Sequence, residues 1–476
     1  MSHIRTSESL INDNFLSLSP VRRIDDLPNE ILAHLLYLGC DDPPRPSKRI
    51  VNGLYEFQTG IPYGVNVSHV CQRWRDVAIG YPLIWTQLHF HYGVSMCMLE
   101  IFIERSRGNS LDIIMSLDGR LYSTKSRKLV ISKFLDMVIP LVERWRCFSL
   151  ASAFPSFTSM VLKQLSECSS APLLEILHIV HFSYNDMHSG AELFLPFQGN
   201  TPKLRSVDFQ GSWIDLEGYL PQLRDLHDLR LTNIAPSFQT FTRILSQSPT
   251  LGFFGLTNTG PADLRNVTPI SLPSLEHLSL SHHPSLYIEY LFPFLQFPNI
   301  KKLELEYSDG DYTKFALMMA TRLPGATKSL LTGLEHLVIH GLSLTQNALE
   351  PVLEQLVNLQ SLAINCSEGK STSPKKFQAG KFIIDQLAVL KQTPSGSQRV
   401  VFCPRLTCLM TTGIVGGTMV NLVAARQKGG ASLSTVRMTE KDEVDGTQRE
   451  WLQQHLDNLY FFKLSGSWKE DWPMQF

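Results

Sequence analysis

The most constraining feature of this 476-residue chain is an apolar pattern, Leu-x-x-Leu-x-Leu, that returns imperfectly along most of its length. Successive copies between Leu204 and Ile300 are spaced by 22, 25, 24 and 25 residues. A near-constant spacing of this size indicates a solenoid, in which each unit buries its apolar face only against its neighbours. The copies begin at Trp85, Leu111, Trp145, Leu174, Leu204, Leu226, Leu251, Leu275, Ile300, Leu334, Leu359, Leu406 and Leu433.

Each copy of the pattern predicts a strand, because its last two apolar residues alternate with non-core positions. The intervals contain helix-like segments, among them Phe238–Leu245, Phe315–Leu323 and Ala348–Leu356. Proline often precedes a copy and favours an extended chain there, as at Pro202, Pro273, Pro298 and Pro404. The fold expected for residues 91–476 is therefore an α/β leucine-rich-repeat solenoid with a parallel sheet on its concave side.

The repeat is irregular in two places and needs a cover at its end. The spacing from Ile300 to Leu334 is 34 residues, and that from Leu359 to Leu406 is 47. The longer interval predicts a polar loop at Ser367–Lys376 followed by an amphipathic helix near Phe382, Ile384, Leu387 and Leu390. The aromatic residues after Glu450 favour a C-terminal cap near 440–476, with a ligand-binding aromatic cluster as the alternative.

Two helices are expected before the repeats. Asp25, Asp26, Pro28 and Glu30 suit the start of a helix, and Gly39 ends its apolar stripe. That stripe consists of Ile31, Leu32, Leu35, Leu36 and Leu38. A second helix is predicted up to Gly80, with Val67, Val70, Cys71, Trp74, Val77 and Ala78 on one face. These large side chains exceed what so small a unit buries internally, which favours a surface for a partner.

The same residues carry a resemblance to a known family. The sequence Leu27-Pro28-x-Glu30-Ile31-Leu32, then Val70-Cys71-x-x-Trp74-Arg75-x-x-Ala78, and then Pro82-Leu83-x-Trp85, resembles the F-box and is similar to F-box-like proteins of fungal type. The resemblance implies a helical module at 21–90 that binds a Skp-type adaptor and, through it, the cullin scaffold of a ubiquitin ligase. The residues it places on or behind the adaptor surface are Leu27, Pro28, Ile31, Leu32, Leu35, Val70, Cys71, Trp74, Pro82 and Trp85.

This sequence departs from the family at an insertion. The family joins its first two helices by a short acidic link, whereas here residues 41–66 intervene, and we expect them to loop out. Loop closure cost grows slowly with length, so such an insertion is compatible with both helices. Residues 1–20 are expected to form a disordered tail.

Composition and charge argue against nucleic acid and membranes as partners and favour a location with reduced thiols. Forty-three basic against 44 acidic residues give a net charge of −1, which offers no overall field for nucleic acid or an anionic membrane. The first 19 residues lack a secretory signal pattern, and the best apolar run, Leu129–Val142, is interrupted by Lys133 and Asp136. Eight scattered cysteines suit reduced thiols, so a cytoplasmic or nuclear location is expected.

The sequence offers no catalytic or cofactor motif, and we expect neither an enzyme nor a cofactor. Gly413-x-x-Gly416-Gly417 lacks the spacing of a dinucleotide site, and Cys403 with Cys408 has no second pair of metal ligands at matching distance. His282-His283, and His336 with His340, would hold a metal only with added carboxylates. A solvated or hydrogen-bonded role is favoured for these histidines, and no metal site is predicted.

The expected concave face gives a second candidate surface. Residues between the core positions of each strand point away from the helices, and inner faces of solenoids commonly bind partners. Mixed charges there favour a client protein over a nucleic-acid backbone. The nominated client-binding residues are Asp208, Gln210, Arg230, His277, Glu304, Glu306, His336, His340 and Arg437. The competing interpretation is that each is simply a solvated strand residue.

Three functions follow from these patterns. The main hypothesis is a substrate receptor of a ubiquitin ligase, which binds an adaptor through 21–90 and a client through the repeats. The second is an interaction scaffold whose F-box-like helices only cap the solenoid. The third and weakest is a hydrolase or metal enzyme on a repeat scaffold.

Overall fold

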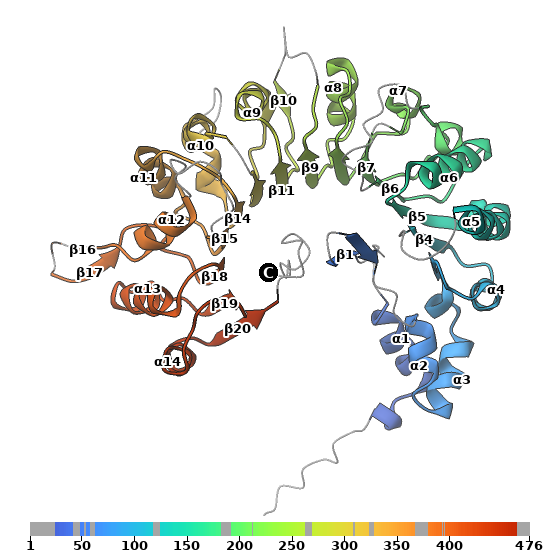
Figure 1. Cartoon of the computed structure of the whole chain (residues 1–476), viewed down its shortest axis with the longest axis horizontal. Helices are drawn as coiled ribbons and strands as arrows, with labels where there is room; N and C mark the ends of the chain where they lie inside the picture. The colour runs from blue at the N-terminus through green and yellow to red at the C-terminus, as the bar shows by residue number, and fades with distance from the viewer. Residues whose placement is uncertain are drawn as a thin grey trace, which may run out of the picture.

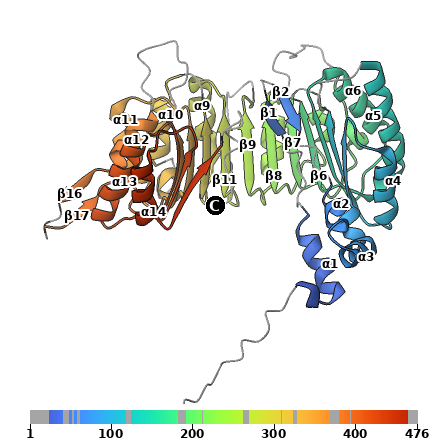
Figure 2. The same cartoon turned by 60° about the horizontal axis from the view of Figure 1, so that its bottom comes forward.

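The chain forms an arc with strands along its inner side and helices along its outer side (Figure 1). The computed structural model describes residues 24–40, 48–51, 54–57, 62–117, 124–181, 192–211, 213–261, 269–307, 310–322, 328–366, 379–392, 394 and 396–463. Fourteen strands form one sheet in the order β20-β19-β18-β15-β14-β13-β11-β9-β8-β7-β6-β5-β4-β3. Neighbouring strands of this sheet are parallel throughout and stand side by side in Figure 2.

The strands of the main sheet coincide with the apolar pattern. Each of the thirteen copies lies at a strand that begins at the first residue of the copy or two residues after it. These strands are β3 (Gln87–His91), β4 (Leu111–Leu117), β5 (Trp145–Ser152), β6 (Ile176–His181), β7 (Ser206–Gln210), β8 (Asp228–Thr232), β9 (Phe253–Thr257), β11 (His277–Ser281), β13 (Lys302–Glu306), β14 (His336–His340), β15 (Ser361–Asn365), β18 (Cys408–Thr412) and β19 (Thr435–Thr439). The prediction of a parallel, solenoid-like α/β fold is confirmed.

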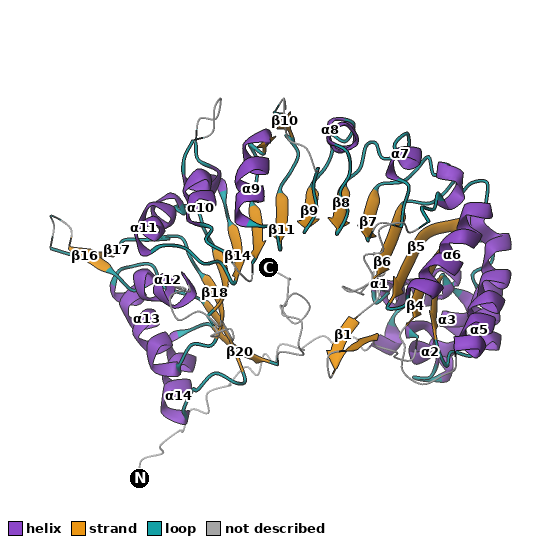
Figure 3. Cartoon of the chain, turned by 45° about the horizontal axis from the view of Figure 1, so that its top comes forward, coloured by secondary structure: helices purple, strands orange, loops and turns teal. Residues whose placement is uncertain are grey.

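Period-two alternation explains why these residues form strands with two different faces. In β8, Leu229 and Leu231 are buried in the main core, whereas Asp228, Arg230 and Thr232 on the other face are partly exposed. The core therefore lies between the sheet and the outer helices, and the opposite face of the sheet lines the inside of the arc (Figure 3).

A turn with a left-handed residue follows several strands. Asn233 (φ 55°) follows β8 and Asn258 (φ 46°) follows β9, and both residues belong to the types that adopt this conformation at low cost. The Nδ2 of Asn258 donates to Oδ1 of Asn233 at 2.9 Å, so equivalent turns are bonded to each other. His282 (φ 57°) occupies the same position after β11. The repeat thus fixes its turns as well as its strands.

The outer helices pack their apolar faces on the sheet. The helix predicted at Phe238–Leu245 is α8, where the Ser237 side chain accepts from the Thr240 amide and starts the helix. The helices of the arc are α4 (Met96–Arg105), α5 (Thr124–Val138), α6 (Pro155–Glu167), α7 (Leu216–Tyr219), α8 (Phe238–Ser246), α9 (Ser285–Leu291), α10 (Thr313–Ala320), α11 (Gln346–Gln355), α12 (Ala379–Leu387), α13 (Gly416–Lys428) and α14 (Gly446–His455). The helices predicted at Phe315–Leu323 and Ala348–Leu356 are α10 and α11.

The long interval between Leu359 and Leu406 holds more structure than the pattern predicted. Its helix is α12, but Leu390 lies in a strand and not in that helix, which corrects the prediction. Strands β16 (Leu390–Gln392) and β17 (Gln398–Val400) form an antiparallel hairpin there. The predicted polar loop at Ser367–Lys376 lies outside the described residues.

A single buried arginine organises this irregular interval. Arg426 of α13 is fully buried, and its guanidinium donates to five backbone carbonyl oxygens. Its acceptors are the carbonyls of Cys403 at 2.8 Å, Ala431 at 3.1 Å, and Leu387, Phe402 and Leu406 at 3.4 Å each. These carbonyls come from the end of α12, the chain entering β18 and the turn after α13. The side chain therefore supplies buried hydrogen-bond donors to three irregular backbone segments at once.

The described part of the predicted C-terminal cap is one more helix and strand. Helix α14 is followed by β20 (Asn458–Phe462), which pairs in parallel with β19. The sequence Leu456-x-x-Leu459-x-Phe461 is a fourteenth copy of the pattern, and it lies within the range predicted for the cap. Residues 464–476 lie outside the described residues.

The N-terminal helices differ from the predicted pair. Helix α1 (Asn29–Leu38) ends at Gly39 as expected, but the second helix is divided into α2 (Tyr63–Ser68) and α3 (Gln72–Gly80). Cys71 causes the division, because its extended backbone and its Sγ atom, 3.5 Å from the Trp74 amide nitrogen, cap a new helix. A short 3₁₀ helix, Ile24–Asp26, precedes α1, and another, Pro82–Trp85, follows α3.

The predicted loop at 41–66 is also partly regular. Strands β1 (Lys48–Val51) and β2 (Leu54–Phe57) form an antiparallel hairpin, and α2 already begins at Tyr63. Figures 1 and 3 place β1 on the inner side of the arc. The predicted tail at 1–20 lies outside the described residues. Two short strands, β10 (Ile270–Ser271) and β12 (Leu295–Gln296), pair on their own.

Candidate functional site

The N-terminal helices are joined to the first repeat by a shared core. Trp85, 1% exposed, donates from Nε1 to the Ala78 carbonyl at 2.7 Å and packs edge-on against Phe102 of α4. The Arg105 guanidinium lies 4.4 Å from the Trp85 ring centre. Leu32 of α1 is fully buried in the same cluster as Leu88 of β3. The helices and the solenoid therefore have one continuous apolar interior.

Helix α1 is apolar on two sides, and only one of them faces that interior. Leu32, Ala33 and Leu36 are buried, whereas Ile31, Leu35 and Leu38 are 50%, 44% and 65% exposed. The exposed three are spaced by four and three residues, so they form one stripe along the helix, which we call the outer stripe. Solvent exposure of such a stripe is unfavourable and is typical of a surface that a partner covers.

The ten residues predicted to meet an adaptor fall into two groups. Leu32 and Trp85 are buried and lie behind the surface, and Trp74 is half-buried against the core. Leu27 and Pro82 are also half-buried. The exposed members are Pro28, Ile31, Leu35, Val70 (60% exposed) and Cys71. Leu38, which belongs to the outer stripe, was predicted in the apolar stripe of this helix but was not nominated for adaptor binding, although its spacing from Leu35 places it on the same face.

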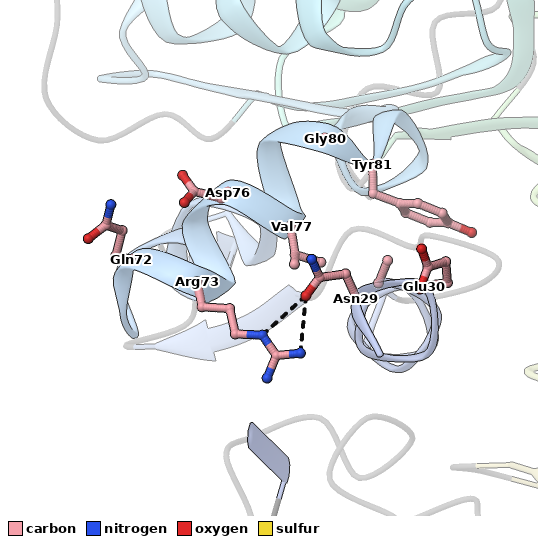
Figure 4. A pocket seen from close by; sticks show the side chains of 9 residues that line it. Asn29, Glu30, Gln72, Arg73, Asp76, Val77, Gly80 and Tyr81 are labelled. Atoms are coloured by element: carbon pink, nitrogen blue, oxygen red, sulfur yellow. Dashed lines mark hydrogen bonds between the residues drawn. The ribbon is translucent and has the colours of Figure 1, made fainter. Parts of the chain in front are cut away.

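A pocket of about 750 Å³ lies between α1 and α3 (Figure 4). Arg73 holds its two walls together, because Nε and Nη2 each donate to Asn29 Oδ1 at 3.1 Å and Nη2 also donates to the Leu27 carbonyl. Its other lining residues are Glu30, Ala33, Gln72, Asp76, Val77, Gly80 and Tyr81. This mixed lining contains no cysteine, serine or histidine nucleophile and suits the insertion of a partner's side chains.

The inner face brings several of the predicted client-binding residues into one cluster. The register aligns Asp208 with Arg230, and Glu306 with His340. All nine predicted residues lie on strands of the main sheet. Asp208, Gln210, Arg230, His277, Glu304, Glu306, His336 and His340 belong to β7, β8, β11, β13 and β14, whereas Arg437 lies apart on β19.

The cluster centres on a buried carboxylate. Glu304, 6% exposed, lies 3.0 Å from His277 Nε2 and 3.2 Å from Lys302 Nζ through its Oε1 atom. His277 contacts the Phe253 ring edge-on, and the Arg230 guanidinium lies 3.8 Å from the centre of that ring. We therefore define the inner cluster as Arg230, Phe253, His277, Lys302 and Glu304.

Phe253 and Lys302 of the inner cluster were not nominated from the sequence. Both stand two residues after the start of a copy, the position that His277 and His336 occupy in their own copies. This shared position in the repeat is the sequence signal that could have placed Phe253 and Lys302 on the inner face.

The charges of the inner cluster depend on pH. Burial lowers the pKa of His277, which outweighs the raising effect of Glu304. For Glu304, burial raises the pKa, but hydrogen bonds and charge from His277 and Lys302 outweigh it and lower the pKa to about 2. Above pH 6.5 the histidine is therefore neutral and Lys302 is the cation beside the carboxylate.

Acidification is expected to destabilise the protein through this cluster. A group whose folded pKa is depressed binds protons more tightly when unfolded, so its stabilisation is complete above the unfolded pKa and is lost below it. For Glu304 the loss falls between pH 4.5 and about 2 and amounts to about 2–3 kcal/mol. The lowered pKa of His277 adds a further loss of stability as pH falls below 6.5, because the unfolded chain then binds the proton more readily. Urea unfolding midpoints measured from pH 7 to pH 2.5 check this.

The matched variants separate Glu304 from the general effect of acid. Glu304→Gln is expected to reduce the pH dependence between 4.5 and 2.5. Glu276→Gln removes an exposed carboxylate that pairs with Lys301 at 2.6 Å, and it is expected to keep the wild-type acid response. Equal acid responses in wild type and Glu304→Gln would refute the assignment.

The remaining candidates for chemistry are hydrogen-bonded or buried side chains. Among the described residues, no group of three or more histidine, cysteine, aspartate and glutamate side chains is placed to hold a metal ion. His283 lies 2.9 Å from the Thr259 carbonyl through Nε2, and His282 lies 3.4 Å from Glu306. Burial raises the pKa of the Cys366 and Cys403 thiols to about 12, which makes both poor nucleophiles. None of the described helices has the length and apolar character needed to cross a membrane.

Comparison with known proteins adds a distant structural likeness. No protein-family model matches the chain, and no curated protein matches it. Among solved structures, the chain is similar to an internalin from Listeria monocytogenes str. 4b F2365, with 12% sequence identity over 63% of this chain and 88% of that chain. The TM-score is 0.26, so the fold assignment depends on the strands and helices described above.

Proposed function

We propose that this chain is a non-catalytic receptor subunit of a cullin-type ubiquitin ligase. In this proposal the N-terminal helices bind a Skp-type adaptor, which is held by the cullin, and the inner face of the solenoid binds a client protein. The chain contributes proximity, since a client held near the ligase is modified at a high effective concentration without chemistry from the receptor.

The observation that carries the proposal is the outer stripe of α1. A helix that only capped the solenoid would need apolar residues on its inward side alone, where Leu32, Ala33 and Leu36 already lie. Ile31, Leu35 and Leu38 add a second apolar side that is largely exposed. Covering the exposed half or more of each such side chain with a partner contributes about 0.8–2 kcal/mol before the entropy cost of association. The exposed stripe indicates that a partner covers α1, and the resemblance to the F-box suggests that this partner is a Skp-type adaptor.

A scaffold without a ligase role is the second candidate. The continuous core through Trp85 and Leu88 favours it, because helices fused to the first repeat would cover the end of the solenoid without any partner. In this case the inner face still binds a protein, but no adaptor binds α1.

Mixing the full chain with a purified Skp-type adaptor distinguishes the two functions. The receptor function predicts a one-to-one complex by size-exclusion chromatography with light scattering, and slower hydrogen exchange in α1 and α3 when the adaptor is present. The scaffold function predicts two separate species and unchanged exchange. Absence of a complex at 50 µM of each protein, about the concentration at which a weak specific complex still forms, would reject the receptor function.

A further inference from the structure

The inner face carries a run of apolar side chains on three neighbouring strands, β14, β15 and β18. Val338, Ala363 and Met410 are aligned across β14, β15 and β18 and are 2%, 0% and 0% exposed. Phe462 of β20 packs against them. We call these four residues the inner patch. The same row carries Arg230, Ser279 and Glu304 on earlier strands and Arg437 on β19, so the apolar run in this row is confined to β14, β15 and β18.

The inner patch is not part of the main core. The residues that alternate with it, such as Leu337, Leu362 and Leu409, point to the outer helices and belong to the main core. In the part of the chain that the structure describes, the helices of the arc lie on the outer side of the sheet (Figure 3). Val338, Ala363 and Met410 lie on the inner side of the sheet and are nearly inaccessible to solvent. Something other than the outer helices must therefore cover them.

Residues 464–476 have the composition to be that occupant. They include Leu464, Trp468, Trp472, Met474 and Phe476, five large apolar side chains in thirteen residues. They directly follow Lys463, the neighbour of the patch residue Phe462. The segment therefore begins beside the patch.

Residues 464–476 are also long enough to cross the inner patch. The patch spans from β20 to β14, which is four strand spacings of about 4.8 Å, or about 19 Å. Thirteen residues reach up to about 40 Å when extended. Less than half of this length is enough to cross the patch.

We propose that residues 464–476 bind the inner patch of their own chain. The segment is then an intramolecular ligand that occupies the C-terminal third of the inner face. The binding itself goes beyond the proposed function, because it requires neither adaptor nor client. Only its consequence, competition with a client for this part of the surface, rests on the proposed function.

Thiol accessibility at the inner patch tests the proposal. Met410→Cys places a thiol in the patch, and labelling by a maleimide is followed by peptide mass spectrometry in the full chain and in a chain that ends at Lys463. We expect labelling at least tenfold faster in the shorter chain. Cys71 is exposed and serves as an internal reference, and Thr232→Cys on the inner face of β8 is the matched control that should label equally in both chains.

A second variant covers the case in which the shorter chain folds poorly. Trp468→Ala, Trp472→Ala and Phe476→Ala combined in the full chain should accelerate labelling in the same way. Equal rates in all chains, or rapid labelling of position 410 in the full chain, would overturn the proposal. Protection of position 410 that disappears on dilution would overturn it too, in favour of a second copy. Adaptor binding by the same variants is measured separately, so failure of one proposal leaves the other testable.

Discussion

Adaptor binding is expected to fall at least a hundredfold when Ile31 and Leu35 are both replaced by Asp. Each substitution removes an apolar side chain from the outer stripe and would place a carboxylate in a dry contact. About half of each side chain is already buried in the free chain, so loss of the remaining burial costs about 0.8–1.5 kcal/mol per residue. Each new carboxylate would also lose its water without gaining a partner, which adds at least about 1–3 kcal/mol. Together these costs exceed the roughly 2.8 kcal/mol that corresponds to about a hundredfold in Kd. Because both side chains are about half exposed in the free chain, the fold should tolerate the change. Isothermal calorimetry with the purified adaptor measures the effect.

The matched control for this pair is Leu286→Asp. Leu286 is 67% exposed on α9, far from α1 along the arc, and the substitution has the same chemistry. It should leave adaptor binding unchanged, and circular dichroism should show all variants folded. Leu32→Ala is unsuitable as a binding test because Leu32 is fully buried, and its truncation costs about 2–5 kcal/mol of stability. A double Asp variant that binds as well as wild type would remove the outer stripe from the interface.

The largest effect on stability is expected for Arg426→Met. The substitution conserves volume but removes the donors to five carbonyl oxygens in a buried site. Breaking such a buried charged network costs about 3–5 kcal/mol. Hydrogen exchange should show the loss first in α12, α13 and the chain leading into β18, because solenoid units are stabilised mainly by their neighbours.

Two further variants calibrate this expectation. Arg426→Lys keeps the positive charge but lacks the planar fork, so it should recover only part of the stability. Arg449→Met on α14 removes an exposed arginine that lies over Phe461, and it should cost less than about 1 kcal/mol. If Arg426→Met unfolds at the same urea concentration as Arg449→Met, the buried network is not a major contribution to stability.

The strands were predictable from sequence because each depends on a short local pattern. Leu229 and Leu231 identify β8 without knowledge of any other strand, and the same spacing identifies the others. The break between α2 and α3 was missed because the apolar face from Val67 to Trp74 continues across it. What ends α2 is the backbone of Cys71 and its contact with the Trp74 amide, which a hydrophobic pattern does not contain.

The candidate surfaces were predictable in position but not in detail. Strand alternation placed Glu304 and His277 on the inner face, but their contact depends on which strands are neighbours. Arg426 was not foreseeable, since its five acceptors come from separate segments of an interval without a regular pattern. The outer stripe shows the same limit. The sequence predicted a single apolar stripe on α1, and only packing of this helix on the core divides it into a buried side and an exposed side.

Trp85 gives the molecule a rigid junction where many multidomain proteins have a hinge. Its ring is enclosed by Ala78, Phe102 and Arg105, so neither a flexible tether nor a water-filled gap separates α3 from the first repeat. A body bound to α1 would therefore keep a fixed direction relative to a body held inside the arc. The distance between these two bodies would be set by the curvature of the sheet. Adding one repeat to the arc would rotate the body inside the arc relative to the body on α1.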